Sequence, residues 1–100
     1  MIDFGRVEGF EWDDGNGRKS LDKHGVDQQE AEQVFQDQRL LVLRDEKHSG
    51  SEQRLHAYGE SAAGRLLLVS FTLRRDGVMI RVISARDMSK RERMRYAEQA

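Results

Sequence analysis

Short apolar runs separated by polar turns divide the chain into segments with the period of a helix or a strand. Residues 8–12 alternate in polarity and predict a short strand. Asp13 or Asp14 can then cap a helix, since short carboxylates satisfy the free amides of a first helical turn. This helix is predicted to run to His24, because Gly25 is a typical residue just after a helix end.

A second helix is indicated from Asp27 onward. Asp27 is a suitable N-cap, and Glu30 three residues later completes the pattern of a capping box. Val26, which precedes the cap, can pack against an apolar residue one turn into the helix. The apolar face of this helix is spaced as Ala31, Val34 and Phe35.

The period changes from helical to strand-like after Asp37. Apolar or alternating runs predict four strands at residues 39–44, 52–59, 65–73 and 78–85. Asp76-Gly77 between the last two is a strong hairpin signal. Ser89, followed three residues later by Glu92, predicts a capping box that opens a final, mostly charged helix.

The order of these elements predicts an α+β fold. Consecutive strands joined by short turns favour an antiparallel sheet, here of about four to five strands, with two N-terminal helices and one C-terminal helix. The chain has no proline, no repeat and no low-complexity stretch that would mark a linker. We therefore expect a single domain over residues 1–100.

Composition narrows the class of protein. Hydrophobic residues make up 37% and charged residues 35% of the chain, and the apolar residues are grouped into runs, as in a folded domain. The absence of cysteine excludes disulfides and thiolate metal sites. The sequence has no apolar stretch long enough to span a bilayer, and residues 1–10 lack a signal-peptide pattern. The expected location is the cytoplasm.

The net charge of −1 conceals an asymmetry between the two halves. Residues 1–50 carry 7 basic and 12 acidic residues, whereas residues 51–100 carry 10 basic and 6 acidic residues. Arginine, which suits bidentate contact with phosphate or carboxylate, dominates the second half. Two interpretations stay open: a surface for a polyanion, or a basic face that is solvated or paired with the acidic half. The arginines are Arg54, Arg65, Arg74, Arg75, Arg81, Arg86, Arg91, Arg93 and Arg95.

Arg81 is the most informative single position. It interrupts an apolar run, and strict alternation places it on one face with Met79, Ile83 and Ala85. Because a charged side chain is rarely buried alone, Arg81 must reach a carboxylate, solvent or a ligand anion. The same alternation places Arg86 on the opposite face, at the strand end, with little packing.

Among the histidines, His56 offers the clearest chemistry. It shares a predicted strand face with Arg54 and Tyr58, which suits acid–base work beside a phosphate, although a half-exposed surface has the same pattern. His48 lies in a polar loop and His24 ends a helix. The sequence shows no metal-ligand spacing, so we expect neither a metal site nor another cofactor.

The ordered set of short motifs resembles the BrnT family of toxins. Each piece is weak alone, but together they extend over roughly residues 10 to 96. They are Phe10-Glu11-Trp12-Asp13, Gly15-Asn16, Lys19, Lys23-His24-Gly25-Val26, Glu30-Ala31, Val34-Phe35, Glu52, Arg54, Gly59, Arg65-Leu66-Leu67, Val69, Thr72, Arg81-Val82-Ile83-Ser84-Ala85-Arg86, Glu92-Arg93 and Tyr96.

The resemblance implies a RelE-like fold and a toxin that blocks translation by cleaving RNA. It also implies a BrnA-like antitoxin with a DNA-binding domain as the neutralising partner. The expected assembly is either a toxin homodimer or a toxin–antitoxin hetero-oligomer. On this basis we expect catalytic roles for Arg54, Arg65, Arg81, Arg86 and His56, and RNA contacts from Lys23, Arg74, Arg75 and Tyr96. The candidates for the general base are Lys23, His48, His56 and Glu52.

Two functions follow as hypotheses. The first is a metal-independent endoribonuclease, in which the ribose 2′-hydroxyl attacks the adjacent phosphate and arginines stabilise the developing charge. The set of arginines favours this function. The second is a degenerate, non-catalytic module that binds its antitoxin and modulates repression of the operon. The slightly acidic net charge favours the second.

Overall fold

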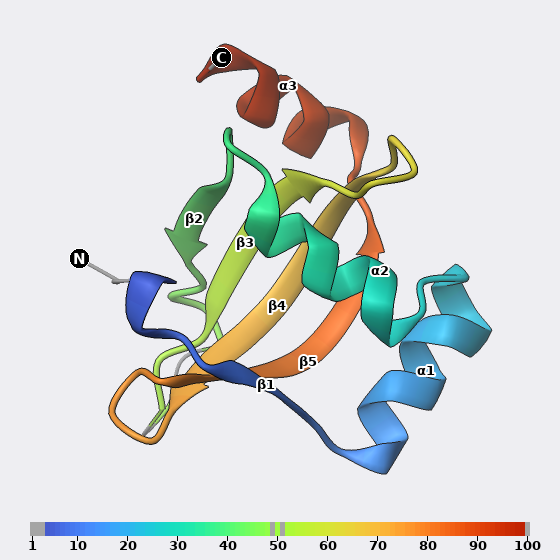
Figure 1. The fold of residues 1–100 in the computed structure, drawn as a ribbon. Coiled ribbons are helices and arrows are strands. Elements are labelled where there is room, and N and C mark those ends of the chain that lie inside the picture. Colours follow the sequence, from blue (N-terminus) through green and yellow to red (C-terminus); the bar gives the residue numbers. More distant parts are fainter. Residues whose placement is uncertain (1–3, 49, 51, 100) are drawn as a thin grey trace.

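The computed structural model describes residues 4–48, 50 and 52–99, in which one sheet of five strands carries short helices on both sides (Figure 1). The helices are η1 (Phe4–Arg6), α1 (Asp14–His24), α2 (Gln28–Gln33), η2 (Val34–Gln36) and α3 (Lys90–Glu98), and the strands are β1 (Gly9–Trp12), β2 (Leu41–Arg44), β3 (Leu55–Glu60), β4 (Leu66–Arg74) and β5 (Met79–Asp87).

The sheet has the strand order β1-β5-β4-β3-β2. The strands β2, β3, β4 and β5 pair in antiparallel fashion with their neighbours, as their short connections predicted. The predicted α+β class is therefore confirmed. One feature differs from the expected sheet: β1 pairs in parallel with β5, so the sheet is mixed. The pairing with β5 holds β1 against the sheet, and Phe10 and Trp12 of β1 thereby pack against the apolar core.

The predicted helix ends are confirmed. Asp13 caps α1 by accepting a hydrogen bond from the amide of Asn16 at 2.7 Å. Gly25 ends the same helix with φ of 64°, in the left-handed region that favours glycine. At α3, Ser89 and Glu92 form the reciprocal capping box that the sequence predicted.

The second capping box is only half formed. The Asp27 side chain accepts from the amide of Glu30 at 2.7 Å, as expected. The Glu30 carboxylate, however, does not return to the cap, and instead binds Ser61 and Arg65 from the other side of the fold. A tertiary ion pair has replaced the local contact.

Helix α1 lies along the edge of β5, beyond the point where β1 ends. There the Asn16 amide donates to the carbonyl of Val82 at 3.4 Å, and the amide of Ala85 donates to Ser20 Oγ at 3.0 Å. Ser20 is 2% exposed, so this hydroxyl satisfies a buried backbone group that no strand reaches.

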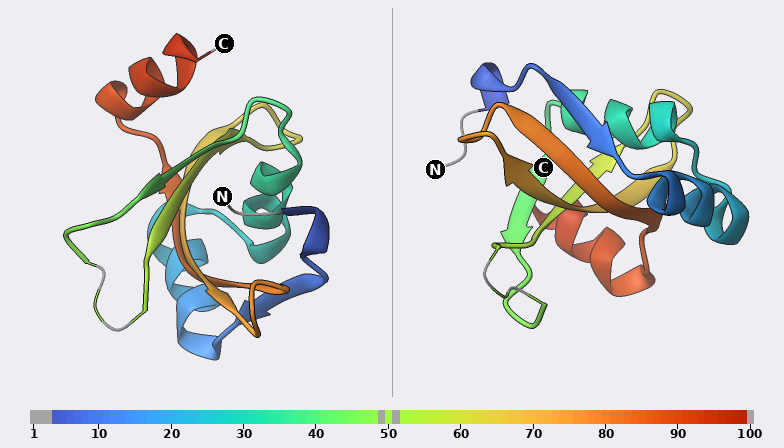
Figure 2. Two further views of the ribbon diagram at one scale, coloured as in Figure 1. Left: turned by 90° about the vertical axis from the view of Figure 1, so that its left-hand side faces the viewer. Right: turned by 90° about the horizontal axis from the view of Figure 1, so that it is seen from below.

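Two apolar clusters lie on opposite faces of the sheet. The larger one packs beneath α2 and η2, where the rings of Phe35 and Phe71 meet edge to face at 5.1 Å. The smaller one holds α3 and consists of Tyr58, Leu68, Met88 and Tyr96. Figure 2 shows α2 and α3 on opposite sides of the sheet in both views. The sheet face on the α3 side is called the open face here, because α3 covers only one end of it.

A bulge in β5 changes which side chains reach the open face. Ser70 pairs with Ser84 but Phe71 pairs with Val82, so Ile83 is an extra residue on β5. The strict alternation predicted for this strand is therefore wrong after Ile83. Ala85 is fully buried in the larger core instead of sharing the face of Arg81. Arg86 pairs with Leu68 and emerges on the same face as Arg81.

Candidate functional site

Three cross-strand rows of side chains form the centre of the open face. Residues that are directly opposite each other on paired strands point to the same face, so the strand register defines the rows. Their members are Arg81 and Thr72 in the first row, Ser84, Ser70 and His56 in the second, and Arg86, Leu68 and Tyr58 in the third. Arg54 directly precedes β3, and we count it with the first row because it lines the same cavity as Thr72 and Arg81. The predicted shared face of Arg54, His56 and Tyr58 agrees with this arrangement.

The first row borders a cavity of about 250 Å³, which is lined by Arg54, Thr72 and Arg81 together with His48, Gly50, Glu52 and Ile83. Arg81 is held loosely. Its Nη2 lies 3.6 Å from Oδ2 of Asp13, and its side chain is 34% exposed. Of the alternatives predicted for Arg81, the structure shows both a carboxylate and solvent, because the contact with Asp13 is long and leaves the guanidinium accessible.

The second row ends in a hydrogen-bonded chain. His56 Nδ1 lies 2.9 Å from Ser70 Oγ, and its Nε2 lies 3.1 Å from Oδ2 of Asp45. Because a carboxylate only accepts hydrogen bonds, Nε2 carries the proton toward Asp45, and Nδ1 of the neutral ring accepts from the Ser70 hydroxyl. The result is a basic nitrogen at a fixed position on the face.

Electrostatics keep His56 neutral and Asp45 ionised. Burial lowers the pKa of His56 below its usual 6.5, and the charges of Arg86 and Arg54 lower it further, against the opposing effect of Asp45. Burial would raise the pKa of Asp45, but hydrogen bonds from the side chain and the backbone amide of His48 outweigh it and lower that pKa. A neutral imidazole beside an ionised carboxylate is the state that a proton acceptor needs.

The third row joins the sheet to α3. Arg86 donates through Nη1 and Nη2 to the two oxygens of Glu92, at 2.7 and 2.9 Å. These bonds are the main reason that the pKa of Glu92 falls to about 2. The expectation that Arg86 has little packing is therefore wrong, because it forms a bidentate ion pair at the base of α3.

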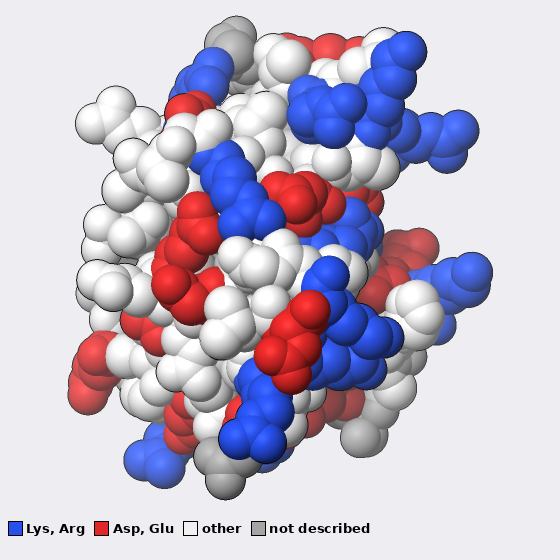
Figure 3. Space-filling view, turned by 90° about the vertical axis from the view of Figure 1, so that its right-hand side faces the viewer, with Lys and Arg blue, Asp and Glu red and all other residues white. Residues whose placement is uncertain are grey.

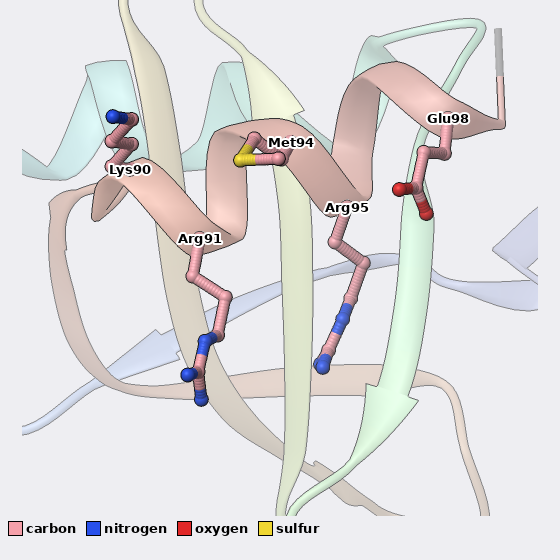
Figure 4. A pocket seen from close by; sticks show the side chains of 5 residues that line it. All are labelled: Lys90, Arg91, Met94, Arg95 and Glu98. Atoms are coloured by element: carbon pink, nitrogen blue, oxygen red, sulfur yellow. The ribbon is translucent and has the colours of Figure 1, made fainter.

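Helix α3 adds positive charge above the rows. Figure 4 shows Arg91 and Arg95 extending from the same side of α3 across the strands, with Met94 between them. They line a shallow cavity of about 510 Å³ together with Lys90 and Glu98. In Figure 3, basic side chains predominate at the upper right, at the height of α3. This end of the open face suits a polyanion.

The structure does not bring Arg65 to this site. Its guanidinium binds Asp87, Glu30 and the carbonyls of His24 and Gly25, at distances of 2.8 to 3.1 Å. Asp87 pairs with Leu67 of the larger core, so this group lies toward the helix-covered face. Arg65 therefore acts as a clamp between α1, α2 and the end of β5.

The predicted RNA-contacting residues are scattered. Lys23 is exposed in the last turn of α1, at the sheet edge. Arg74 pairs with Glu52 at 2.9 Å, and Arg75 in the hairpin pairs with Glu11 at 3.1 Å. Tyr96 is 3% exposed, and its hydroxyl donates a hydrogen bond to Asp37. Its role is therefore to hold α3 against the rest of the fold.

The other candidates for the general base are less well placed than His56. Glu52 is engaged by Arg74, and Lys23 belongs to α1 and to none of the three rows. The His48 side chain is 57% exposed and turns its Nδ1 toward Asp45 at 3.0 Å. His56 alone among the four stands within a row of the sheet.

Sequence patterns missed three members of the site. Asp45 stands in a polar loop with no distinguishing spacing, and only the fold brings it to His56. Ser70 and Thr72 were detectable, since they are alternate polar residues in an otherwise apolar strand. Two polar residues on the same face of an apolar strand indicate that this face does not pack only against the hydrophobic core.

In the part of the chain that the structure describes, no three His, Asp or Glu side chains group together as metal ligands. Within the same residues, no helix has both the length and the apolar character needed to cross a bilayer.

Alanine variants of Arg65 and Arg81 should differ in stability, because Arg65 connects three elements of the fold whereas Arg81 is held by one long contact. Arg65→Ala removes several charge-assisted hydrogen bonds and should lower the free energy of unfolding by about 2 kcal/mol. Arg81→Ala should change it by no more than about 0.5 kcal/mol, because its contact with Asp13 is long and exposed. Urea denaturation of both variants measures the difference, and equal losses would contradict these assignments.

Comparison with known proteins identifies the family. Residues 12–92 match the family model described as the ribonuclease toxin BrnT of type II toxin–antitoxin systems. Among solved structures, the chain is similar to the Brucella abortus ribonuclease toxin BrnT, with a TM-score of 0.63 and 23% sequence identity over 84% of this chain and 100% of that chain. At that identity the structural likeness shows a shared fold. No curated protein matches the sequence. The family match extends over most of the chain, and the protein therefore belongs to the BrnT family of ribonuclease toxins of type II toxin–antitoxin systems.

Proposed function

We propose that this protein is a metal-independent endoribonuclease whose active site is the open face. The observation that carries the proposal is the chain Asp45–His56–Ser70, which lies between rows that contain arginines on either side. Metal-free RNA cleavage needs a proton acceptor beside fixed positive charge, and this face supplies both.

In the proposed reaction, the ribose 2′-hydroxyl gives its proton to Ser70 Oγ while Ser70 gives its own to His56 Nδ1. Asp45 stabilises the imidazolium that forms and fixes the tautomer through Nε2. The 2′-oxygen forms a bond to phosphorus, the bond from phosphorus to the 5′-oxygen breaks, and the departing oxygen takes a proton from solvent. The products are a 2′,3′-cyclic phosphate and a 5′-hydroxyl.

Arg86 is the proposed stabiliser of the transition state. Successive rows on β4 are two residues apart, or about 6.8 Å, which the long arginine side chain can span. Glu92 orients the guanidinium through two bonds, and Nη1 also donates to the carbonyl of Asp87 at 3.1 Å. These bonds leave the Nε–H and the second Nη2–H, which can donate to a phosphate oxygen. Arg91 and Arg95 would then guide the RNA strand along α3.

We predict that the purified protein cleaves RNA in the presence of a chelator and leaves cyclic-phosphate ends. His56→Ala should lower the cleavage rate by about a hundredfold or more, because it removes the proton acceptor. Arg86→Ala should lower it about a hundredfold through lost charge stabilisation. Arg44→Ala is the control, since Arg44 pairs with Leu55 of the larger core and so faces away from the site. Cleavage that stops with the chelator and returns with a divalent ion would contradict the mechanism.

A second candidate function is a non-catalytic module that binds its antitoxin and modulates operon repression. The ion pair of Arg86 with Glu92 favours it, because a neutralised arginine stabilises a phosphate less well. Expression in cells without a partner discriminates between the two. An active ribonuclease arrests growth, whereas the module does not.

The proposed partner is a BrnA-like antitoxin with a DNA-binding domain, which would place an acidic segment over the open face. The cations Arg91, Arg95 and Lys90 around the exposed Met94 support a partner segment that is both acidic and apolar. We expect the complex to be a hetero-oligomer in the cytoplasm, where the RNA substrate is found.

Co-expression with the product of the adjacent gene should yield one peak in gel filtration and restore growth. Arg91→Glu combined with Arg95→Glu should weaken that complex by reversing the charge of α3. Failure of the neighbouring product either to co-elute or to relieve toxicity would rule out this partner.

A further inference from the structure

Thr72 carries a buried polar group that the fold leaves unsatisfied. The residue is 5% exposed, and its Oγ1 is the one buried side-chain oxygen or nitrogen without a hydrogen-bond partner among the described residues. A buried hydroxyl without a partner is costly, and native structures rarely retain one. Thr72 also stands in the middle of the first row, between two arginines.

The surroundings of Thr72 suit an oxyanion. Arg81 is directly opposite on β5, and Arg54 lines the same cavity of about 250 Å³ from the β3 side. Arg81 keeps donors available, since Asp13 approaches it only to 3.6 Å. The acidic residue on the cavity wall, Glu52, is already engaged by Arg74 at 2.9 Å. His48 completes the wall and is turned toward Asp45.

We propose that the cavity lined by Arg54, Thr72 and Arg81 binds a phosphate group, with the Thr72 hydroxyl as a donor to one of its oxygens. Guanidinium groups and a hydroxyl match a tetrahedral oxyanion in geometry and charge. The arginine side chains are long and partly exposed, so they can move apart to admit the ligand to the hydroxyl.

The site is distinct from the position of bond cleavage. Thr72 and Ser70 are two residues apart on β4, which separates the first and second rows by about 6.8 Å. That separation is close to the spacing of neighbouring phosphates along an extended RNA strand. If the proposed ribonuclease function holds, the ligand is an RNA phosphate. The cavity at Thr72 would then bind the phosphate next to the scissile one. A free phosphate monoester has the same chemistry.

Binding to the full-length chain tests the proposal without any turnover. Amide chemical shifts are followed by NMR during titration with inorganic phosphate, and separately with a 2′-deoxy oligonucleotide that cannot be cleaved. We expect both probes to shift the amides around Thr72, and Thr72→Val to weaken both at least tenfold. Thr72→Ser, which keeps the hydroxyl, should bind like the wild type. Arg44→Ala is the matched control on the opposite face.

Stability and kinetics separate binding from a structural role. Because the hydroxyl has no partner to lose, Thr72→Val should melt at the same temperature as the wild type or higher. In RNA cleavage it should raise KM and leave kcat unchanged, whereas His56→Ala should lower kcat.

Each outcome has a defined meaning. Unchanged phosphate affinity in Thr72→Val, or a lowered melting temperature, overturns the proposal even if RNA is still cleaved. Loss of affinity in a protein that cleaves no RNA supports the phosphate site and rejects the ribonuclease. Saturation by inorganic phosphate without any effect of the oligonucleotide overturns the RNA assignment in favour of a free phosphate.

Discussion

The extra residue at Ile83 determines the chemistry of the open face. Without it, β5 would alternate strictly, and Arg86 would point toward the helix-covered core while Ala85 would face outward. The bulge reverses this pattern, so Arg81, Ser84 and Arg86 emerge on one face and Ala85 packs with Val82 in the core. One inserted residue thus brings the three rows together, in keeping with the frequent occurrence of bulges beside functional sites.

The charged side chains divide into those that hold the fold and those that surround the cavity. Arg65 binds two carboxylates and two carbonyls, and its pKa is raised chiefly by its hydrogen bond to Asp87. Arg86 has both roles, because it anchors α3 through Glu92 while it stands beside the His56 row. Arg81 has a single long contact in comparison. Net charge alone is therefore a poor guide to function here, since pairing decides which arginines can meet a phosphate.

Local signals in the sequence were sufficient for most of the fold but for only part of the site. Caps at Asp13, Asp27 and Ser89 and the hairpin near Gly77 act within a few residues, and the structure confirms them. The parallel pairing of β1 and the bulge at Ile83 depend on distant partners, so a single sequence does not encode them in a local pattern. The same limit applies to Asp45, which meets His56 only after the sheet has formed.

The pH dependence of kcat/KM tests most directly whether His56, held by Asp45, is the proton acceptor for RNA cleavage. His56 must be neutral to accept a proton, and its pKa lies below 6.5. We therefore expect kcat/KM to rise with pH through an apparent pKa below 6.5. Asp45→Asn should shift that acid limb to lower pH, because it removes the charge that favours the imidazolium. An acid limb that persists in His56→Ala, or does not move in a folded Asp45→Asn protein, would contradict the account.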